Sequence, residues 1–408
     1  MTKLHLLLYL MALAACGGDE SLGSVDRSVV PSAAGHVPDG LPKRLTVGLY
    51  AVHGDRWMAD SGVPWDARFR YLARGWRNNF DTWGDDGSWA LAYMNEADAR
   101  GEIPVLAYIE LMDPPDNDYL GRIQDAAAMA TYFADFKLLM ERVRDFGKPV
   151  AVLLENTAFA FIELAARHDP AVPAAVASSG LPELADLPNT VAGWGLAFLR
   201  LRRSVGALNA KLAIDVAHWA SGLDVTYVDA SVPLRPEVDR VWAFLEPMGL
   251  APNVTGDTYD LLSHHVSDFD FDYSKLVLNK DLWWDVVDSA SASTRSFTRY
   301  LAWLALWNQR AARRWVLWEI PVGNSYHLNM DNTGQPRGGY RDNRVEWIFG
   351  SSGAEHRRGL TRAGVVMLLC GLAASTQASV TNDYDDEGHL FMQTHAGAFL
   401  SSGGLALP

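Results

Sequence analysis

Residues 149–156 read PVAVLLEN, a short apolar run between a Pro and two polar residues. Such a run is typical of a strand buried on both faces of a sheet. The stretch before it repeats apolar side chains every three or four positions, which is typical of one face of a helix: Met129, Phe133, Phe136, Met140 and Val143. A covering helix followed by a buried strand indicates a βαβ unit and a parallel sheet.

The same alternation continues along the chain from residue 41. Helix-like stripes recur at 192–205 and 296–309. Strand-like runs occur, in order, at 44–51, 79–83, 104–111, 149–156, 211–218, 260–266, 314–320 and 374–381. Eight strands with intervening helices over this length predict a single-domain α/β fold, a (β/α)8 TIM barrel that spans residues 41–408.

Two features of this assignment depend on short segments. The apolar run at 362–372, which contains Cys370, is interpreted as a helix, so that 374–381 becomes the eighth strand. The alternative fold is a doubly wound open sheet. Its dinucleotide-binding form needs several glycines after the first strand. Residues 51–55 (AVHGD) contain one glycine, and the barrel is therefore the favoured prediction.

Composition and charge narrow the classes of partner. The chain of 408 residues is 49% hydrophobic and 21% charged, which is typical of a globular protein. Its formal net charge of −14 comes from 35 Lys and Arg against 49 Asp and Glu. An acidic protein without a basic stripe is a poor match for nucleic acid and has no attraction to anionic lipid. No nucleic-acid partner is expected.

The first residues resemble a bacterial lipoprotein signal. Lys3 precedes an apolar run at 4–15, which ends in Leu-Ala-Ala before Cys16. The resemblance implies a signal peptide at 1–15 and a lipid on Cys16. The stretch that follows is rich in Gly, Ser, Asp, Val and Pro without periodicity, which predicts a flexible tether over 16–40. Gly17 after the cysteine implies outer-membrane sorting in the bacterial cell envelope, on the periplasmic or the surface face. The membrane would then be reached through the lipid anchor alone.

Most of the predicted strands end in a polar residue. In a TIM barrel these carboxyl ends form the face on which active sites are built. The candidate residues at these ends are Glu110, Glu155, Asn156, Asp215, His218, Glu319 and Asp383. Tyr108 lies two residues before Glu110, on the same side of its strand, and is a candidate to hydrogen-bond a carboxylate or a sugar hydroxyl.

Glu155 and Glu319 each follow an apolar run that should be buried. A partly desolvated carboxyl group suits a general acid, while a better hydrogen-bonded one stays ionised. Glu at the ends of the fourth and seventh strands resembles the largest barrel clan of retaining glycoside hydrolases. The resemblance implies Glu155 as acid/base and Glu319 as nucleophile. That clan usually has Asn before the acid/base Glu, whereas here Leu154 precedes Glu155 and Asn156 follows it.

The sequence contains 15 Trp, a surplus that fits a carbohydrate ligand. Sugar rings present C–H faces that stack on indoles, while their hydroxyls need polar partners. Trp83, Trp219 and Trp318 are the candidates for such stacking because they lie at predicted strand ends or in loops. The predicted substrate is a polysaccharide or an oligosaccharide.

No cofactor and no metal are expected. His264 and His265 are adjacent in a predicted strand and point to opposite faces, so they cannot share one ion. A zinc set of His264, His218 and Asp215 is the alternative that remains for a metal. A second alternative comes from another class, a non-catalytic glycan-binding lipoprotein on a barrel scaffold. Anchor, acidic surface and indoles would serve such a binder equally well.

Overall fold

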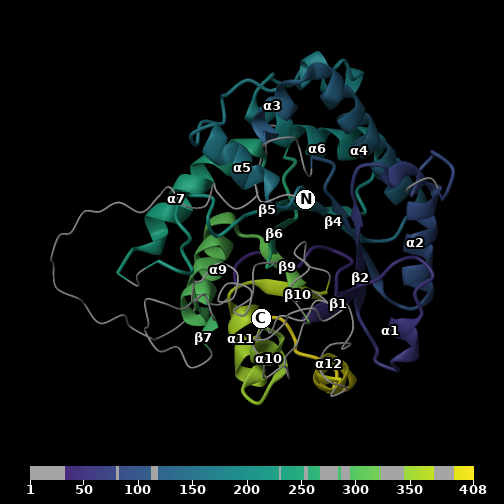
Figure 1. Cartoon of the computed structure of the whole chain (residues 1–408), viewed down its shortest axis with the longest axis vertical. Coiled ribbons are helices and arrows are strands. Elements are labelled where there is room, and N and C mark those ends of the chain that lie inside the picture. The colour runs from purple at the N-terminus through teal and green to yellow at the C-terminus, as the bar shows by residue number, and fades with distance from the viewer. Residues whose placement is uncertain are drawn as a thin grey trace, which may run out of the picture.

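The computed structural model confirms the barrel. It describes residues 33–79, 82–111, 118–228, 231–251, 256–266, 284–285, 295–320, 322, 344–371 and 390–408. Eight parallel strands close into one barrel in the order β1-β10-β9-β6-β5-β4-β3-β2. Figure 1 shows these strands at the centre of the molecule, with helices arranged around them. The architecture is the (β/α)8 TIM barrel that the sequence predicts.

The barrel strands are β1 (Thr46–Tyr50), β2 (Ala67–Leu72), β3 (Ile103–Tyr108), β4 (Val150–Leu154), β5 (Ala210–Asp215), β6 (Leu261–His265), β9 (Arg314–Ile320) and β10 (Val365–Cys370). Two further short strands, β7 (Trp284–Asp285) and β8 (Arg295–Ser296), pair with each other outside the barrel.

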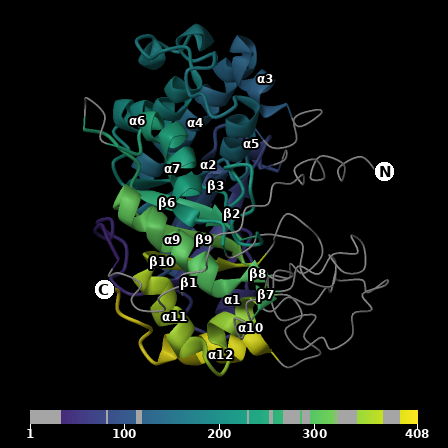
Figure 2. The ribbon, with the colours of Figure 1, turned by 90° about the vertical axis from the view of Figure 1, so that its left-hand side faces the viewer.

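Helices follow most of the strands and cover the outside of the barrel, as the two views in Figures 1 and 2 show. They are α1 (Trp57–Asp60), α2 (Ser88–Ala99), α3 (Tyr119–Gln124), α4 (Ala126–Phe146), α5 (Ala158–Ala165), α6 (Val191–Val205), α7 (Leu234–Leu245), α9 (Phe297–Ala311), α10 (Arg344–Phe349), α11 (Gly353–Arg362) and α12 (Phe391–Ser401). The stripes predicted before the fourth strand, at 192–205 and at 296–309 correspond to α4, α6 and α9. Within the described residues no helix is long and apolar enough to cross a membrane.

The second predicted strand, 79–83, is wrong. Asn79 ends the 3-10 helix Trp76–Asn78 with a φ of 48°, and the second strand of the barrel is β2 instead. Its sequence, ARFRYL, contains two arginines, which are unusual in a buried strand. Arg68 is fully buried because its guanidinium pairs with Glu102 at 2.5 Å and with Glu96 at 3.0 Å.

The eighth predicted strand is also misplaced. The segment interpreted as a helix, 362–372, contains strand β10, whose sequence VVMLLC is buried throughout. A continuous apolar run of this length does not distinguish a buried strand from a helix by its periodicity. Residues 374–381, which were assigned to that strand, lie outside the described residues. The remaining predicted strands overlap observed ones.

Alternate residues of each strand face the inside of the barrel. The inner core is one cluster of buried side chains separate from the larger core between strands and helices. Its members from the strands include Ala67, Phe69, Val105, Ala107, Ala151, Leu153, Ala213, Leu261, Val316, Trp318, Met367 and Leu369. Since strand side chains alternate, residues two positions further toward the carboxyl ends share this inward face.

Apolar residues from both ends of the described chain close the amino-terminal end of the barrel. Val37, Leu41 and Leu407 pack against the inner core. Arg314 at the start of β9 donates to the carbonyl of Gly35 at 3.0 Å and to that of Pro408 at 2.9 Å. Residues 33–40, the described part of the expected tether, therefore contact the barrel. The opposite end is left for a functional site.

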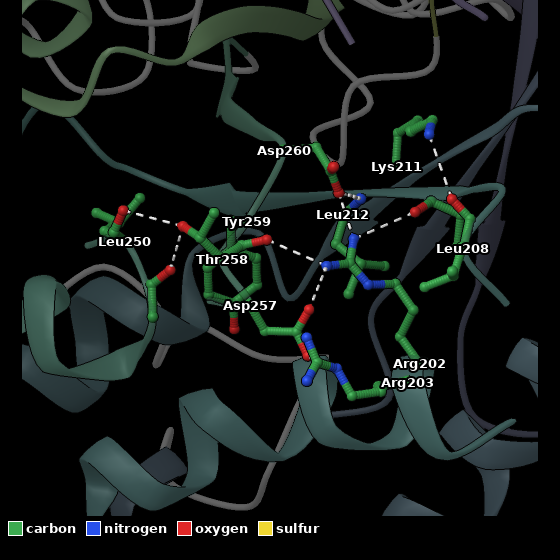
Figure 3. A network of polar contacts seen from close by, with 12 residues as sticks. Arg202, Arg203, Leu208, Lys211, Leu212, Leu250, Asp257, Thr258, Tyr259 and Asp260 are labelled. Carbon is green, nitrogen blue, oxygen red and sulfur yellow. Dashed lines mark hydrogen bonds and ion pairs between the residues drawn. The ribbon is translucent and has the colours of Figure 1, made fainter. Parts of the chain in front are cut away.

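A network of ion pairs joins α6 to the segment before β6 at the amino-terminal end of the barrel (Figure 3). The Arg202 guanidinium pairs with Asp260, lies 3.8 Å from Asp257, and donates to the carbonyls of Thr258 at 3.1 Å and Ala210 at 3.3 Å. The side chain of Arg202 is only 7% exposed. A buried cation with this many acceptors fixes the helix against the barrel.

Replacing Arg202 by Met should lower the free energy of unfolding by about 3 kcal/mol, because it leaves Asp260 without its cation in a partly buried place. Arg203 is the matched control: it pairs with Asp257 at 2.6 Å, but its side chain is 46% exposed. Arg203→Met should cost less than about 1 kcal/mol. Urea denaturation of both variants measures the difference, and equal losses would contradict the assignment of Arg202 as the anchor.

Candidate functional site

Glu319 lies at the carboxyl end of β9 and its carboxylate is turned toward the inside of the barrel. Oη of Tyr71 donates to Oε1 of Glu319 at 2.6 Å. Tyr71 is two positions beyond Phe69 of the inner core, on β2. The sheet order places β2 three strands from β9 around the ring. The hydrogen bond therefore reaches across the mouth of the barrel.

The backbone at Glu319 is what turns this side chain inward. Trp318 and Val316 face the inner core, so regular alternation would direct Glu319 toward the helices. However, φ of Glu319 is 53°, and the pairing of β9 with β10 skips a residue between Leu317 and Ile320. A bulge with a left-handed residue reorients a side chain at a cost of about 1–3 kcal/mol. The backbone strain thus lies at the residue that carries the carboxylate, Glu319.

Aromatic rings line the inside of the barrel beside this carboxylate. The ring of Trp318 lies 6.0 Å from Tyr71 and 6.2 Å from Phe69, and Tyr50 lies 5.5 Å from both Tyr71 and Phe69. The Trp318 side chain is buried, and its Nε1 has no hydrogen-bond partner among the described residues. Trp318 therefore places a buried polar N–H beside the residues that surround Glu319.

Asp215 is a second buried carboxylate on the inner face. It ends β5, two positions after the inner-core residue Ala213, and pairs across to Ser263 of β6. Nδ1 of His265 lies 3.8 Å from Oδ1 of Asp215. Hydrogen bonds from the side chain and the backbone of His265 favour the ionised form of Asp215, whereas Oγ of Ser263 has no hydrogen-bond partner within the described part of the chain. Buried polar atoms without partners are rare in folded proteins and call for an explanation.

Two further histidines lie behind Asp215. His264 faces the helices, and its Nδ1 lies 2.9 Å from the carbonyl oxygen of Val216, while burial holds its pKa well below the usual value. Nε2 of His218 lies 3.4 Å from Asp224, and its ring packs edge-on against His264 at 5.3 Å. Among the described residues no group of three His, Cys, Asp or Glu side chains is placed to hold a metal ion.

Glu155, at the end of β4, is buried but directed away from the inside of the barrel. Its carboxylate accepts a hydrogen bond from Oη of Tyr132 at 2.8 Å and from the backbone N–H of Leu111 at 3.2 Å. Tyr132 belongs to α4 and packs against Tyr108 and Phe198 in the core between strands and helices. Glu155 follows Leu153 on the inward face, but its φ of 44° reverses the direction of the side chain.

Burial raises the pKa of Glu155 to about 8, although the bonds from Tyr132 and Leu111 oppose the rise. Glu110, which precedes Leu111, also has a pKa raised to about 8, first by burial and then by Asp135. Its Oε1 has no hydrogen-bond partner among the described residues. Asn156 lies half-buried in the turn between β4 and α5. Glu110 and Glu155 thus form a pair of protonatable groups behind β3 and β4.

Tyr108 belongs to the same outer layer. Its hydroxyl donates to the carbonyl of Tyr132 at 2.8 Å and its ring packs on Phe136 of α4. The hydroxyl is therefore committed to the helix layer, while its neighbour Ala107 faces the inner core. Tyr108 and Glu110 do lie on the same side of the chain, as their spacing of two residues predicts. That side faces outward, toward the helices, because Ala107 and Ile109 face the inner core.

The candidate tryptophans occupy different environments. Trp318 lies inside the barrel, as described above. Trp83, in the loop after β2, is 40% exposed and packs edge-on against His53 at 5.7 Å. Trp219, after β5, is half-buried and packs on Phe161 at 5.0 Å. Asp383 and Cys16 lie outside the described residues. The structure thus directs Asp215, Trp318 and Glu319 to the inside of the barrel, whereas Glu155 points to the layer of helices.

Two residues at the center of this site were not identified from the sequence. Tyr71 was missed because strand β2 was assigned elsewhere, although the spacing of Ala67, Phe69 and Tyr71 is that of one strand face. His265 was considered as a metal ligand, whereas it lies next to the carboxylate of Asp215. In both cases the alternation of side chains along the strand could have indicated that the residue faces the inside of the barrel.

Comparisons with known proteins give similar folds at low identity. No protein-family model and no curated protein matches the chain. A beta-glucosidase from Thermotoga maritima in complex with castanospermine is 12% identical, with a TM-score of 0.49 over 90% of this chain and 99% of that one. A GH26 beta-mannanase from Bacteroides ovatus is 14% identical, with a TM-score of 0.44 over 88% and 89%.

Cellobiohydrolase II from Humicola insolens, in complex with glucose and cellotetraose, is 11% identical, with a TM-score of 0.38 over 66% of this chain. This chain spans 64% of the length of that cellobiohydrolase. At such identities the residues of this chain must decide what its site does.

The raised pKa of Glu155 predicts how stability depends on pH. A folded pKa of about 8 lies above the unfolded value of about 4.3, so the folded state keeps a proton that the unfolded state releases. The contribution of this group is full below about pH 4 and is lost as pH rises toward 8. Glu155→Gln, which does not titrate, should therefore flatten the fall in free energy of unfolding between pH 5 and 8.

Urea denaturation at a series of pH values measures this effect, which is at most about 1.4 kcal/mol per pH unit. Glu355→Gln, at an exposed position of α11, is the matched control and should follow the wild type. Parallel curves for the wild type and Glu155→Gln would show that Glu155 is already ionised in the folded protein.

Proposed function

We propose that this protein hydrolyses glycosidic bonds of a polysaccharide at the carboxyl-terminal mouth of its barrel. The observation that carries the proposal is the convergence of Glu319, Tyr71 and Trp318 inside the barrel, with a second buried carboxylate, Asp215, near His265 on the neighbouring strands. Glycosidic cleavage needs two carboxyl groups, one to protonate the leaving oxygen and one to attack the sugar or to activate water.

The surroundings of Glu319 suit the ionised carboxylate. A phenol that donates a hydrogen bond to a carboxylate favours its charged form. Burial and the charge of Glu319 hold the pKa of Tyr71 well above its usual value, so Tyr71 stays a donor. A carboxylate held in one orientation by a short bond of 2.6 Å is suited to attack the anomeric carbon.

Trp318 supports a sugar as the ligand. Its flat apolar ring lies next to the carboxylate, with Tyr71 and Phe69 around it. Its unpaired Nε1, and the unpaired Oγ of Ser263, can serve the hydroxyl groups of a sugar. A ligand with both C–H faces and hydroxyls satisfies this mixture of apolar and polar groups.

The finer version of the proposal is the double displacement that the sequence predicts, with Glu155 as acid and Glu319 as nucleophile. A pKa of about 8 would keep Glu155 protonated at neutral pH, as a general acid requires. To reach a sugar beside Glu319, its carboxyl group would have to leave Tyr132 and Leu111. A retaining enzyme would also need the two carboxyl groups about 5–5.5 Å apart.

Glu319→Gln should abolish the release of reducing ends from polysaccharides, with a loss of at least about 10³-fold in kcat, because the amide cannot attack. Tyr71→Phe should lower kcat by about 10²-fold, because it removes one hydrogen bond to the reacting carboxylate. A reducing-sugar assay on a panel of bacterial and plant polysaccharides measures both.

Glu346→Gln, on α10, is the control for the loss of a carboxylate away from the inner face of the barrel, and should behave as the wild type. Affinity electrophoresis in gels containing the same polysaccharides separates the enzyme from a glycan-binding protein. Retarded migration of the wild type without release of reducing ends from any polysaccharide would favour the non-catalytic binder.

We also propose that the protein is held at the bacterial outer membrane through a lipid on Cys16, as the resemblance of residues 1–16 to a lipoprotein signal implies. Cys16→Ser should move the protein from the membrane fraction to the soluble fraction of cells, because no acyl chain can be attached. Cys370→Ser is the matched control, since Cys370 is a buried thiol of β10. Membrane association that survives Cys16→Ser would refute the anchor.

A further inference from the structure

We propose that Asp215, rather than Glu155, delivers the proton to the leaving oxygen in this barrel. The inference rests on the proposed glycosidase function and names the second catalytic residue of that site. It reassigns the acid from the end of the fourth strand around the barrel, β4, to the end of the fifth, β5.

The placement of Asp215 is the first argument. Its side chain is fully buried on the inward face of β5, where its polar neighbour is His265, with Nδ1 at 3.8 Å from Oδ1 of Asp215. Full burial of a carboxyl group costs desolvation free energy, which a histidine at 3.8 Å offsets only in part. A substrate oxygen that accepts the carboxylic proton would give this group a further partner inside the barrel.

The relation of Asp215 to Glu319 is the second argument. His265, which lies 3.8 Å from Asp215, is paired across the sheet with Trp318, and their rings are 6.5 Å apart. Trp318 precedes Glu319 and packs on Tyr71, the donor to Glu319. A continuous set of inward side chains therefore joins the two carboxyl groups from β5 through β6 to β9.

The contacts of Glu155 are the third argument. Its carboxylate is already satisfied by Tyr132 and by the backbone N–H of Leu111, on the side of α4. To act on a sugar inside the barrel, it would give up both bonds and reverse its left-handed backbone at residue 155. Asp215 needs no such rearrangement.

The electrostatic environment also suits an acid. Burial raises the pKa of Asp215 to about 6, while His265 on β6 and His218 after β5 limit the rise. A group with this pKa carries its proton in mildly acidic solution and loses it near neutrality. The rate should therefore fall as pH rises through about 6, whereas an acid of pKa about 8, as at Glu155, would hold the rate until pH 8.

The reaction step balances with these two groups. The carboxyl proton of Asp215 passes to the glycosidic oxygen as the bond from that oxygen to the anomeric carbon breaks. The leaving oxygen keeps the bonding electron pair, and a carboxylate oxygen of Glu319 forms an ester to the anomeric carbon. Water then attacks this carbon, its proton passes to the Asp215 carboxylate, and the ester bond breaks to restore the carboxylate of Glu319.

The test compares leaving groups. The probes are 2,4-dinitrophenyl and phenyl glycosides of the oligosaccharide that the wild type releases from polysaccharide. A dinitrophenolate departs without a proton, whereas a phenolate needs one. Asp215→Asn should lower kcat/KM for the phenyl glycoside by about 10²–10⁴-fold and that for the dinitrophenyl glycoside by less than about tenfold. Partial unfolding would lower both values of kcat/KM equally. The ratio of the two values therefore measures the loss of proton donation alone.

Glu155→Gln is the rival variant and should lower both rates by the same small factor. Asp98→Asn, on α2, where Asp98 pairs with Lys148 at 2.6 Å, is the control and should change neither. In the wild type, the basic limb of kcat/KM should lie near pH 6. A leaving-group-dependent loss in Glu155→Gln, or an equal loss on both probes in Asp215→Asn, would overturn the inference. Absence of any release by the wild type would instead reject the glycosidase function itself.

Discussion

The closed barrel imposes one constraint on which the rest of the structure depends: only alternate side chains of each strand can enter its interior. Below the mouth this alternation fills the interior with small and apolar residues, such as Ala151 on β4 and Val316 on β9. At the carboxyl ends it brings Asp215 and His265 inward without any change in the backbone. The alternation that packs the interior of the barrel therefore also places these polar side chains at its mouth.

Two glutamates depart from that alternation, and they do so in opposite directions. Left-handed φ values turn Glu319 into the barrel, where Tyr71 meets it, and turn Glu155 out toward Tyr132. Because a left-handed conformation costs a non-glycine residue about 1–3 kcal/mol, it persists only where the surroundings hold it. The sequence positions of these residues are equivalent, at the ends of apolar runs, but their environments are not.

This difference in environment explains which features of the structure could be predicted from the sequence. The strand pattern around residues 149–156 was sufficient to predict the barrel and most of its strands, since their apolar runs are continuous. It missed β2 because Arg68 is neutralised by Glu102, a partner that only the fold brings near. It could place Glu319 at a strand end, but not foresee the bulge that turns it inward, because a bulge depends on pairing with β10.

The surplus of tryptophan has a similar explanation. Most of the described indoles, among them Trp194 and Trp307, are buried between strands and helices, where their area stabilises a large barrel. Trp318 differs because it lies inside the barrel, in the inner core. Its Nε1 has no partner among the described residues, but the same is true of Trp194 and Trp307. What links Trp318 to the candidate site is its position: it precedes Glu319 in β9 and packs against Tyr71, which donates to that carboxylate.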